Sequence, residues 1–324
     1  MNDQEEHPLP TVKPGEPEEE KRTSLARTLI SLALFIGLDY WLFGSWLAVA
    51  ILVTVIFIHE LGHFLMMKRF GYKAVNMTFV PFVGAYVSGT ATDLSRKNKI
   101  YVLLAGPLPG IVIGCVLLYC AYHLQDPLYQ KIAMPFLLLN LFNLLPIIPL
   151  DGGQFFQTLF FSGSRYIQLA FLYVSLVLIL FGSLQFRGMW PLLFVAVLLL
   201  FRITSAHRNI RIQKKLDAAG IDYACSYDDL TDEEYYQIRR IVIADKPGLA
   251  KKYDAEVLSA NEQPLIAHIE AVLLPAYTND LSALQKFIFI LTWLIAFLLP
   301  ILQWMYYHEL LNSTSSFFAV THFF

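Results

Sequence analysis

An apolar run from Trp46 to Met67 contains the segment His59-Glu60-Leu61-Gly62-His63, and the only other polar residue of that run is Thr54. A run of this length can cross a bilayer as a helix. Lipid does not solvate ionisable side chains, so each of the three in this segment needs a partner, and such residues indicate a functional site. The sequence therefore predicts a membrane-spanning helix that carries a buried polar site.

The spacing of the two histidines predicts a metal site. Positions i and i+4 lie on one face of a helix, so His59 and His63 can both present a ring nitrogen to one ion. Glu60 is placed to take a proton from water at that metal, as in H-E-x-x-H helices. Two surface histidines are the alternative, but burial in an apolar helix favours the metal. A second His-Glu pair, His308-Glu309, lacks the later histidine and is expected at a membrane interface.

The composition excludes an ordinary soluble globular protein. The chain is 56% hydrophobic and 15% aromatic, and its mean hydropathy is +0.52. We expect an all-α polytopic membrane protein with about seven transmembrane helices, a small membrane-associated β-hairpin and a small helical cytoplasmic domain. The net charge of -2 gives no indication of a nucleic-acid partner. The three cysteines suggest neither a disulfide framework nor a cysteine metal site.

Charge and hydropathy divide the chain into four parts. We expect a disordered cytoplasmic tail over residues 1–24, a six-helix membrane domain over 25–205 with the metal core at 45–160, a small helical cytoplasmic domain over 206–283, and a final transmembrane helix with a short tail over 284–324. The basic residues Lys21, Arg22 and Arg27 at the start of the first span place the N-terminus in the cytoplasm, and Lys68-Arg69 return the chain to that side after the second span. His59 precedes Lys68 by nine residues, so the metal should lie about 13 Å below that boundary, accessible from the cytoplasmic half.

A short segment after the second predicted span has the pattern of β-structure. Val, Thr, Phe and Tyr dominate from Val75 to Gly89, where Pro81, Gly84 and Gly89 exclude a continuous helix. We expect a hairpin that turns near Pro81 to Gly84. Non-helical backbone at membrane depth must be buried in protein or line a wet cavity, so the hairpin is expected beside the metal site. An ordinary cytoplasmic loop is the alternative.

Glycines recur every four residues in the third predicted span, Ile100 to Tyr122. The segment Ala105 to Gly110 should interrupt that helix, and Gly106, Gly110 and Gly114 allow another helix to approach closely. We interpret this span as a packing element.

The fourth predicted span, which starts near Lys131, offers a third metal ligand. Pro146, Pro149 and Gly152-Gly153 stop a regular helix where Asp151 appears among apolar residues. Zinc bound by two histidines needs a third protein ligand and keeps its fourth position for water. Asp151 is the candidate, and a helix-capping role is the alternative.

Together these segments resemble one family. His59-Glu-Leu-Gly-His63 is similar to the H-E-x-G-H helix of the site-2 proteases, the intramembrane zinc metalloproteases of peptidase family M50. Asn143-x-x-Pro146-x-x-Pro149-Leu-Asp151-Gly-Gly resembles that family's N-x-x-P-x-x-x-x-D-G segment, and Ala105-Gly-Pro107 resembles a motif between the two. The resemblance covers residues 45–160. Unlike many bacterial members, this chain has Asp151 only 88 positions after His63, without an inserted PDZ domain.

The resemblance implies one Zn²⁺ per chain held by His59, His63 and Asp151, with Glu60 as the catalytic base. It also implies that Asn143 holds or polarises the scissile carbonyl; without it, Asn143 would be interpreted as a polar residue bonded to a neighbouring helix. The implied partners are a single-pass transmembrane protein substrate and the lipid bilayer, and the implied location is the bacterial inner (cytoplasmic) membrane. The sequence does not predict an oligomeric state.

Two other functions compete with this one. A zinc-binding membrane transporter explains the buried histidines and Asp151, but it gives no reason for a base at Glu60. A non-catalytic membrane scaffold is disfavoured because every expected catalytic position is filled.

Overall fold

The computed structural model describes residues 13–14, 25–80, 84–90, 95–161, 164–185, 192–255, 257–259, 261–274, 278 and 280–313. Most of the expected tail at 1–24, the hairpin turn at 81–83, the connection at 186–191 and the end of the chain at 314–324 lie outside the described residues. The described elements are α1 (Leu25–Phe43), α2 (Trp46–Arg69), β1 (Lys73–Val80), β2 (Gly84–Thr90), α3 (Arg96–Ala105), α4 (Pro107–Leu124), α5 (Pro127–Asn143), α6 (Asp151–Phe156), the π-helix η1 (Gln157–Phe161), α7 (Arg165–Gln185), α8 (Leu192–Ala219), α9 (Asp232–Asp245), α10 (Pro247–Ala250), α11 (Gln263–Glu270) and α12 (Ala283–Ser313).

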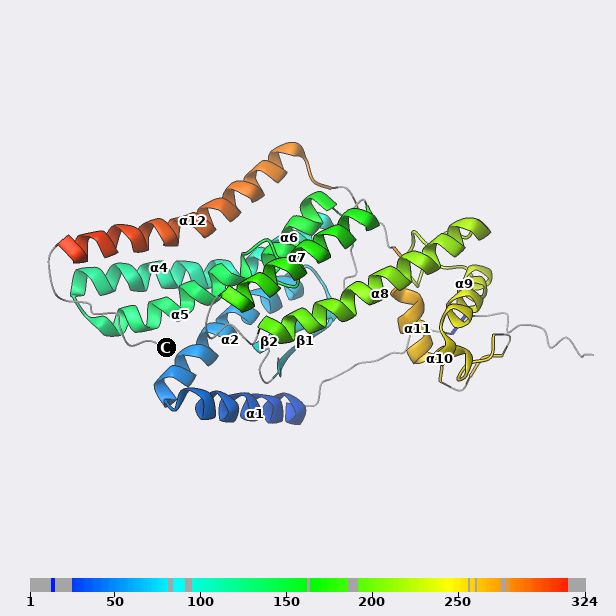
Figure 1. Cartoon of the computed structure of the whole chain (residues 1–324), viewed down its shortest axis with the longest axis horizontal. Coiled ribbons are helices and arrows are strands. Elements are labelled where there is room, and N and C mark those ends of the chain that lie inside the picture. The colour runs from blue at the N-terminus through cyan, green and yellow to red at the C-terminus, as the bar shows by residue number, and fades with distance from the viewer. Residues whose placement is uncertain are drawn as a thin grey trace, which may run out of the picture.

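The helices form an elongated molecule with α2 near its middle (Figure 1). α4 and α5 lie side by side, and α12 runs along their outer side. α8 extends away from this bundle toward α9, α10 and α11, which gather at the other end of the long axis (Figure 1). The protein is therefore a helical bundle with a small helical domain attached through α8.

Five helical stretches within the described residues are long and apolar enough to cross a membrane. They are Trp46–Arg69, Arg96–Leu124, Arg165–Gln185, Leu192–Ala219 and Ala283–His308. The structure therefore does not confirm the number of about seven spans that we expect from the sequence. The described apolar part of α1 is the short stretch Ile30–Trp41, and α5 has only 17 residues because its helix ends before Pro146 and Pro149. Apolar side chains on the outside of α7, α8 and α12 fit a lipid surrounding, and the chain is an integral membrane protein.

Local sequence explains the ends of the helix that carries the histidines. Ser45 caps the start of α2 by accepting a hydrogen bond from the backbone N–H of Ala48. Lys68 and Arg69 lie in its last turn, where basic side chains interact favourably with the helix dipole. The predicted interruption of the third span is confirmed, because α3 ends at Ala105 and α4 begins at Pro107.

The expected β-hairpin is present. β1 and β2 pair antiparallel, from Lys73 opposite Thr90 to Val80 opposite Gly84. α1 packs against β1, with the rings of Phe35 and Phe79 6.1 Å apart between centroids. The other strand, β2, contacts α2, so the hairpin lies between the first two helices.

The last turns of α8 and the residues that follow enclose a core of their own, which includes Ile212, Tyr235 and Ile269. A capping box is present at the start of α9: Thr231 accepts from the N–H of Glu234, whose carboxylate accepts from the N–H of Thr231. α8 continues without a break through the expected boundary at residue 205, so that its last turns pack into this small domain.

Candidate metal centre

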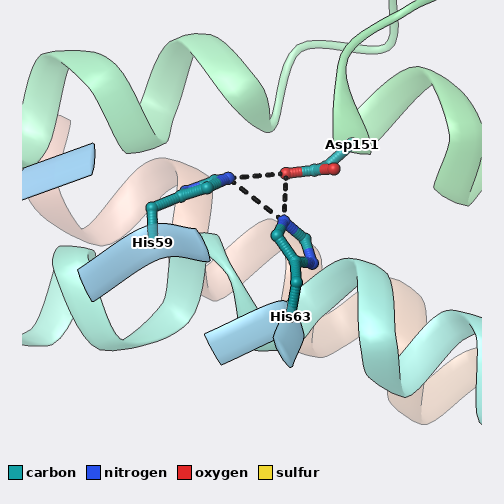
Figure 2. Close-up of side chains that lie close together, drawn as sticks. All are labelled: His59, His63 and Asp151. Atoms are coloured by element: carbon teal, nitrogen blue, oxygen red, sulfur yellow. Dashed lines mark hydrogen bonds and ion pairs between the residues drawn. The ribbon is translucent and has the colours of Figure 1, made fainter. Parts of the chain in front are cut away.

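Two histidines and one aspartate meet where α2 faces the start of α6. Figure 2 shows His59 and His63 projecting from α2 toward Asp151 on the opposite segment. The Oδ2 atom of Asp151 lies 3.1 Å from Nε2 of His59 and 3.2 Å from Nε2 of His63. The two Nε2 atoms are 3.1 Å apart. All three residues predicted as metal ligands are thus brought together from positions up to 92 residues apart in the chain.

The other ring nitrogen of each histidine has an oxygen acceptor. Nδ1 of His59 lies 2.8 Å from Oδ1 of Asn140, and Nδ1 of His63 lies 2.8 Å from the backbone oxygen of Val102. The Asn140 amide is itself oriented, because its Nδ2 donates to the backbone oxygen of Phe136 at 2.7 Å. Both Nδ1 atoms must therefore carry the proton, and in a neutral imidazole the lone pair is then on Nε2.

These contacts leave three electron-pair donors facing one another. Two unprotonated Nε2 atoms and a carboxylate oxygen repel one another unless a cation or a proton lies between them. A tetrahedral zinc with bonds of about 2.0 Å keeps neighbouring ligand atoms about 3.3 Å apart, close to the separations found here. His59, His63 and Asp151 could hold a metal ion. Two imidazole nitrogens and one carboxylate oxygen are ligands that suit zinc.

Glycines on α4 allow this close approach. A Cβ at Gly106 would overlap the imidazole of His63, and a Cβ at Gly110 would overlap the side-chain amide of Asn140. Gly114 meets Leu137 of α5 in the same way. The glycine repeat thus allows the close helix packing that we predicted. Gly106 also lies against His63, and Gly110 lies against Asn140, which supports His59.

Asp151 is set by the irregular segment between α5 and α6. Its side chain does not cap the helix, because the N-cap position is Leu150 and makes no side-chain cap bond. The adjacent Gly152 and Gly153 lie so close to the backbone of Leu144 and Ile147 that a Cβ at either would overlap it. The segment is also tied to α7, since the N–H of Ile148 donates to Oγ of Ser175 at 3.0 Å.

Glu60 is buried, with 8% of its surface exposed. It lies close enough to His59, His63 and Asp151 to interact with their charges, and the backbone of Val87 on β2 donates a hydrogen bond to it. The hairpin is therefore in direct contact with the expected base, as its predicted place beside the site requires.

The two asparagines of α5 differ in their contacts. Asn140, which the sequence did not single out, is fully buried and binds His59. Asn143, the residue implied by the family resemblance, donates to the backbone oxygen of Leu139 in its own helix at 3.2 Å. In the sequence, both asparagines stand out only as polar residues in an apolar helix. That pattern does not indicate which of the two faces the histidines. The role of Asn143 stays a prediction.

Several known proteins that are similar to this chain are named as zinc metalloproteases. Residues 47–136 match the model of peptidase family M50. This region includes His59, Glu60 and His63 and ends before Asn140 and Asp151. A zinc metalloprotease of Methanocaldococcus jannaschii is 25% identical over 57% of this chain and 57% of that protein. Stage IV sporulation protein FB of Bacillus subtilis is 32% identical over 36% of this chain and 41% of that protein.

The alignments thus span about half the length of these two curated relatives. Among solved structures, the site-2 protease from Methanocaldococcus jannaschii is similar, with a TM-score of 0.40 and 24% identity over 56% of this chain and 88% of that chain.

Proposed function

We propose that this chain, whose residues 47–136 match the model of peptidase family M50, is an intramembrane zinc metalloprotease that hydrolyses a peptide bond within or near the transmembrane segment of a membrane-protein substrate. The observation that carries the proposal is the convergence of His59, His63 and Asp151 in a buried part of the bundle, directly beside Glu60. Burying two imidazole nitrogens and a carboxylate oxygen costs free energy when no cation binds them, because lipid and apolar side chains cannot solvate these atoms.

In this proposal the two histidines and Asp151 hold one zinc ion. When bound, zinc supplies Lewis acidity that makes water a better nucleophile and polarises a peptide carbonyl. Glu60 takes the proton from the attacking water and later gives it to the leaving amine. Asn143 donates a hydrogen bond to the oxygen that becomes negative during attack. Asn140 and Val102 keep the two imidazoles in the tautomer that binds metal.

The hairpin is proposed to hold the substrate. A transmembrane substrate has its peptide groups in helical hydrogen bonds and must be locally unwound before attack. β2 pairs with β1 along one side, and the donation from Val87 to Glu60 brings its other side toward the base. An unwound segment added to that side would lie next to Glu60 with its backbone extended.

The exposed Tyr86 on β2 provides a test of this step. Tyr86→Ala should weaken cleavage and leave the zinc content unchanged, because the side chain lies outside the metal cluster. A simultaneous loss of metal would indicate that β2 supports folding of the site and has no role of its own in binding substrate.

The position of the site in the membrane is part of the same proposal. Basic residues in the last turn of α2 and along the second half of α8 support a cytoplasmic N-terminus, a cytoplasmic small domain and a site open to the cytoplasmic half of the bacterial inner membrane. A single-pass protein is the proposed substrate, and the small domain at 206–283 is the candidate element for selecting it.

The experiment compares native membranes that contain the wild type or Glu60→Gln, with quantitative mass spectrometry of full-length and trimmed membrane proteins. Glu60→Gln keeps the metal ligands and removes the base. Single-pass proteins should accumulate in this variant while their cytoplasmic fragments disappear. Glu309→Gln, which makes the same change in the His308-Glu309 pair of α12, is the matched control and should behave as wild type. An unchanged membrane proteome with zinc still bound would favour a transporter or a scaffold.

A further inference from the structure

Two residues of the N-terminal segment, Lys13 and Pro14, lie on the small domain more than 200 positions away in sequence. The contacts are polar and specific. The ammonium nitrogen of Lys13 lies 2.9 Å from the backbone oxygen of Tyr227, 2.8 Å from that of Asp228 and 2.6 Å from that of Leu230. These three oxygens belong to the turn that leads into α9.

The three oxygens satisfy the ammonium group completely. A lysine ammonium has three N–H donors, and each has one carbonyl acceptor here. The charge also lies 5.3 Å from the centroid of the Tyr227 ring, within the range of a cation–π interaction. A guanidinium is planar, with its donors in a fixed fork, so it does not match three oxygens that surround a single nitrogen. This site is therefore suited to lysine over arginine.

Two further hydrogen bonds involve the backbone of the same segment. The N–H of Lys13 donates to Oδ1 of Asp232 at 2.7 Å, and the hydroxyl of Tyr227 donates to the backbone oxygen of Pro14 at 2.7 Å. Pro14 also lines a shallow pocket with Leu258 and Gln263. Binding thus depends on the side chain of position 13 and on the direction of the chain around it.

The site is preorganised by the fold of the domain. The Tyr227 side chain is buried in the core with 4% exposure, and Leu230 is buried with 3% exposure. The N–H of Leu230 donates to the backbone oxygen of Tyr227 at 3.3 Å, and the capping box at Thr231 fixes the start of α9 immediately afterwards. A rigid acceptor set loses little entropy when it binds its ligand.

We propose that the small domain is a peptide-binding module that recognises lysine, and that its resident ligand is the Lys13–Pro14 pair of the same chain. Its lysine clamp consists of Tyr227, Asp228, Leu230 and Asp232. The clamp has a mechanical consequence, because only the ten residues 15–24 separate Pro14 from the start of α1. A link of that length spans at most about 40 Å when fully extended. Binding of Lys13 therefore ties α1, which packs on the hairpin beside Glu60, to the small domain.

Amine labelling of the full-length protein in lipid nanodiscs tests the clamp. Reductive methylation of Lys13, quantified by mass spectrometry, should be at least about tenfold slower than methylation of the same lysine in a synthetic peptide of residues 8–18, because all three N–H donors are engaged. The double variant Tyr227→Phe with Asp232→Ala should raise the rate toward that of the peptide. Glu233→Ala removes an acid from the same helix turn and should leave Lys13 protected.

Competition on the wild-type protein separates recognition of lysine from attraction of charge and does not depend on any variant folding. Excess peptide 8–18 should displace the resident segment and raise the labelling rate of Lys13 in the full-length chain. The same peptide with Lys13→Arg should not. The proposal is overturned if Lys13 of the full-length chain reacts as fast as in the free peptide, if the double variant stays protected, or if the arginine peptide competes equally well.

Discussion

Replacing Asn140 by alanine should weaken zinc binding although Asn140 is not itself a ligand. Its Oδ1 is the acceptor for Nδ1 of His59 at 2.8 Å, and its side chain is fully buried. Without this acceptor, nothing in the described contacts of His59 fixes the proton on Nδ1 or holds the ring toward Asp151. The imidazole is then free to adopt the other tautomer, in which Nε2 carries the proton and cannot bind metal.

The expected loss follows from the number of contacts removed. One supporting hydrogen bond to a metal-binding histidine contributes about 10- to 100-fold in metal affinity, which equals about 1.4 to 2.8 kcal/mol. Asn140 supports one of the two histidines, while His63 keeps its own bond to the backbone oxygen of Val102 at 2.8 Å. The variant should therefore bind zinc with lower affinity, and it should recover activity when zinc is added in excess.

The assay is a competitive zinc titration of purified protein with a chromophoric chelator, together with cleavage measured at saturating zinc. Asn143→Ala is the matched control, because it removes the second asparagine of α5, whose described hydrogen bond is to its own helix. It should leave zinc affinity unchanged and lower the rate of cleavage. Wild-type zinc affinity in Asn140→Ala, in a folded protein, would show that the bond to His59 does not set the metal site.

Two further predictions concern the packing around the site and the small domain. Gly106→Ala should lower zinc affinity by at least about tenfold, because the added Cβ overlaps the imidazole of His63, whereas Gly37→Ala, with open space around the added Cβ, should bind zinc as the wild type does; the same zinc titration measures both. Burial alone would raise the pKa of Glu262, but hydrogen bonds from Arg239 and the backbone of Ser259 hold this pKa below its ordinary value of 4.5. The folded domain thus binds this proton less tightly than the unfolded chain, so its stability should be fully present above pH 4.5 and should fall as the pH drops through the folded-state pKa. Glu262→Gln should reduce this slope, measured as the urea midpoint of amide exchange in α9 and α11 at several pH values.

The meeting of His59, His63 and Asp151 could be predicted because its sequence pattern is local. The spacing of His59 and His63 fixes a common helix face, and the chemistry of zinc requires a third ligand, which only one carboxylate near the helix-breaking segment could supply. The roles of these residues, and of Glu60 as the base, still rest on the experiments above. Helix periodicity and coordination chemistry are enough to bring these residues together, without knowledge of how the bundle packs.

The hydrogen bond between Asn140 and His59 could not be predicted in the same way. Asn140 and Asn143 lie three residues apart, and which of them faces α2 depends on the rotation of α5 about its axis. The approach of Gly110 on α4 to Asn140 contributes to that rotation, and it is a tertiary contact between residues 30 positions apart. The number of membrane spans depends on the length of each helix in the fold, and the expected seven spans stay a prediction.

X-ray absorption at the zinc edge of the purified, zinc-loaded protein examines the coordination itself. A centre made by His59, His63 and Asp151 should give a shell of nitrogen and oxygen atoms at about 2.0 to 2.1 Å, with outer-shell scattering from two imidazoles and no sulfur. His63→Ala should lose one imidazole from this signal, and Asp151→Ala should lose none. A sulfur shell at about 2.3 Å, or a signal without imidazole scattering, would place the metal elsewhere and remove the basis for the proposed protease.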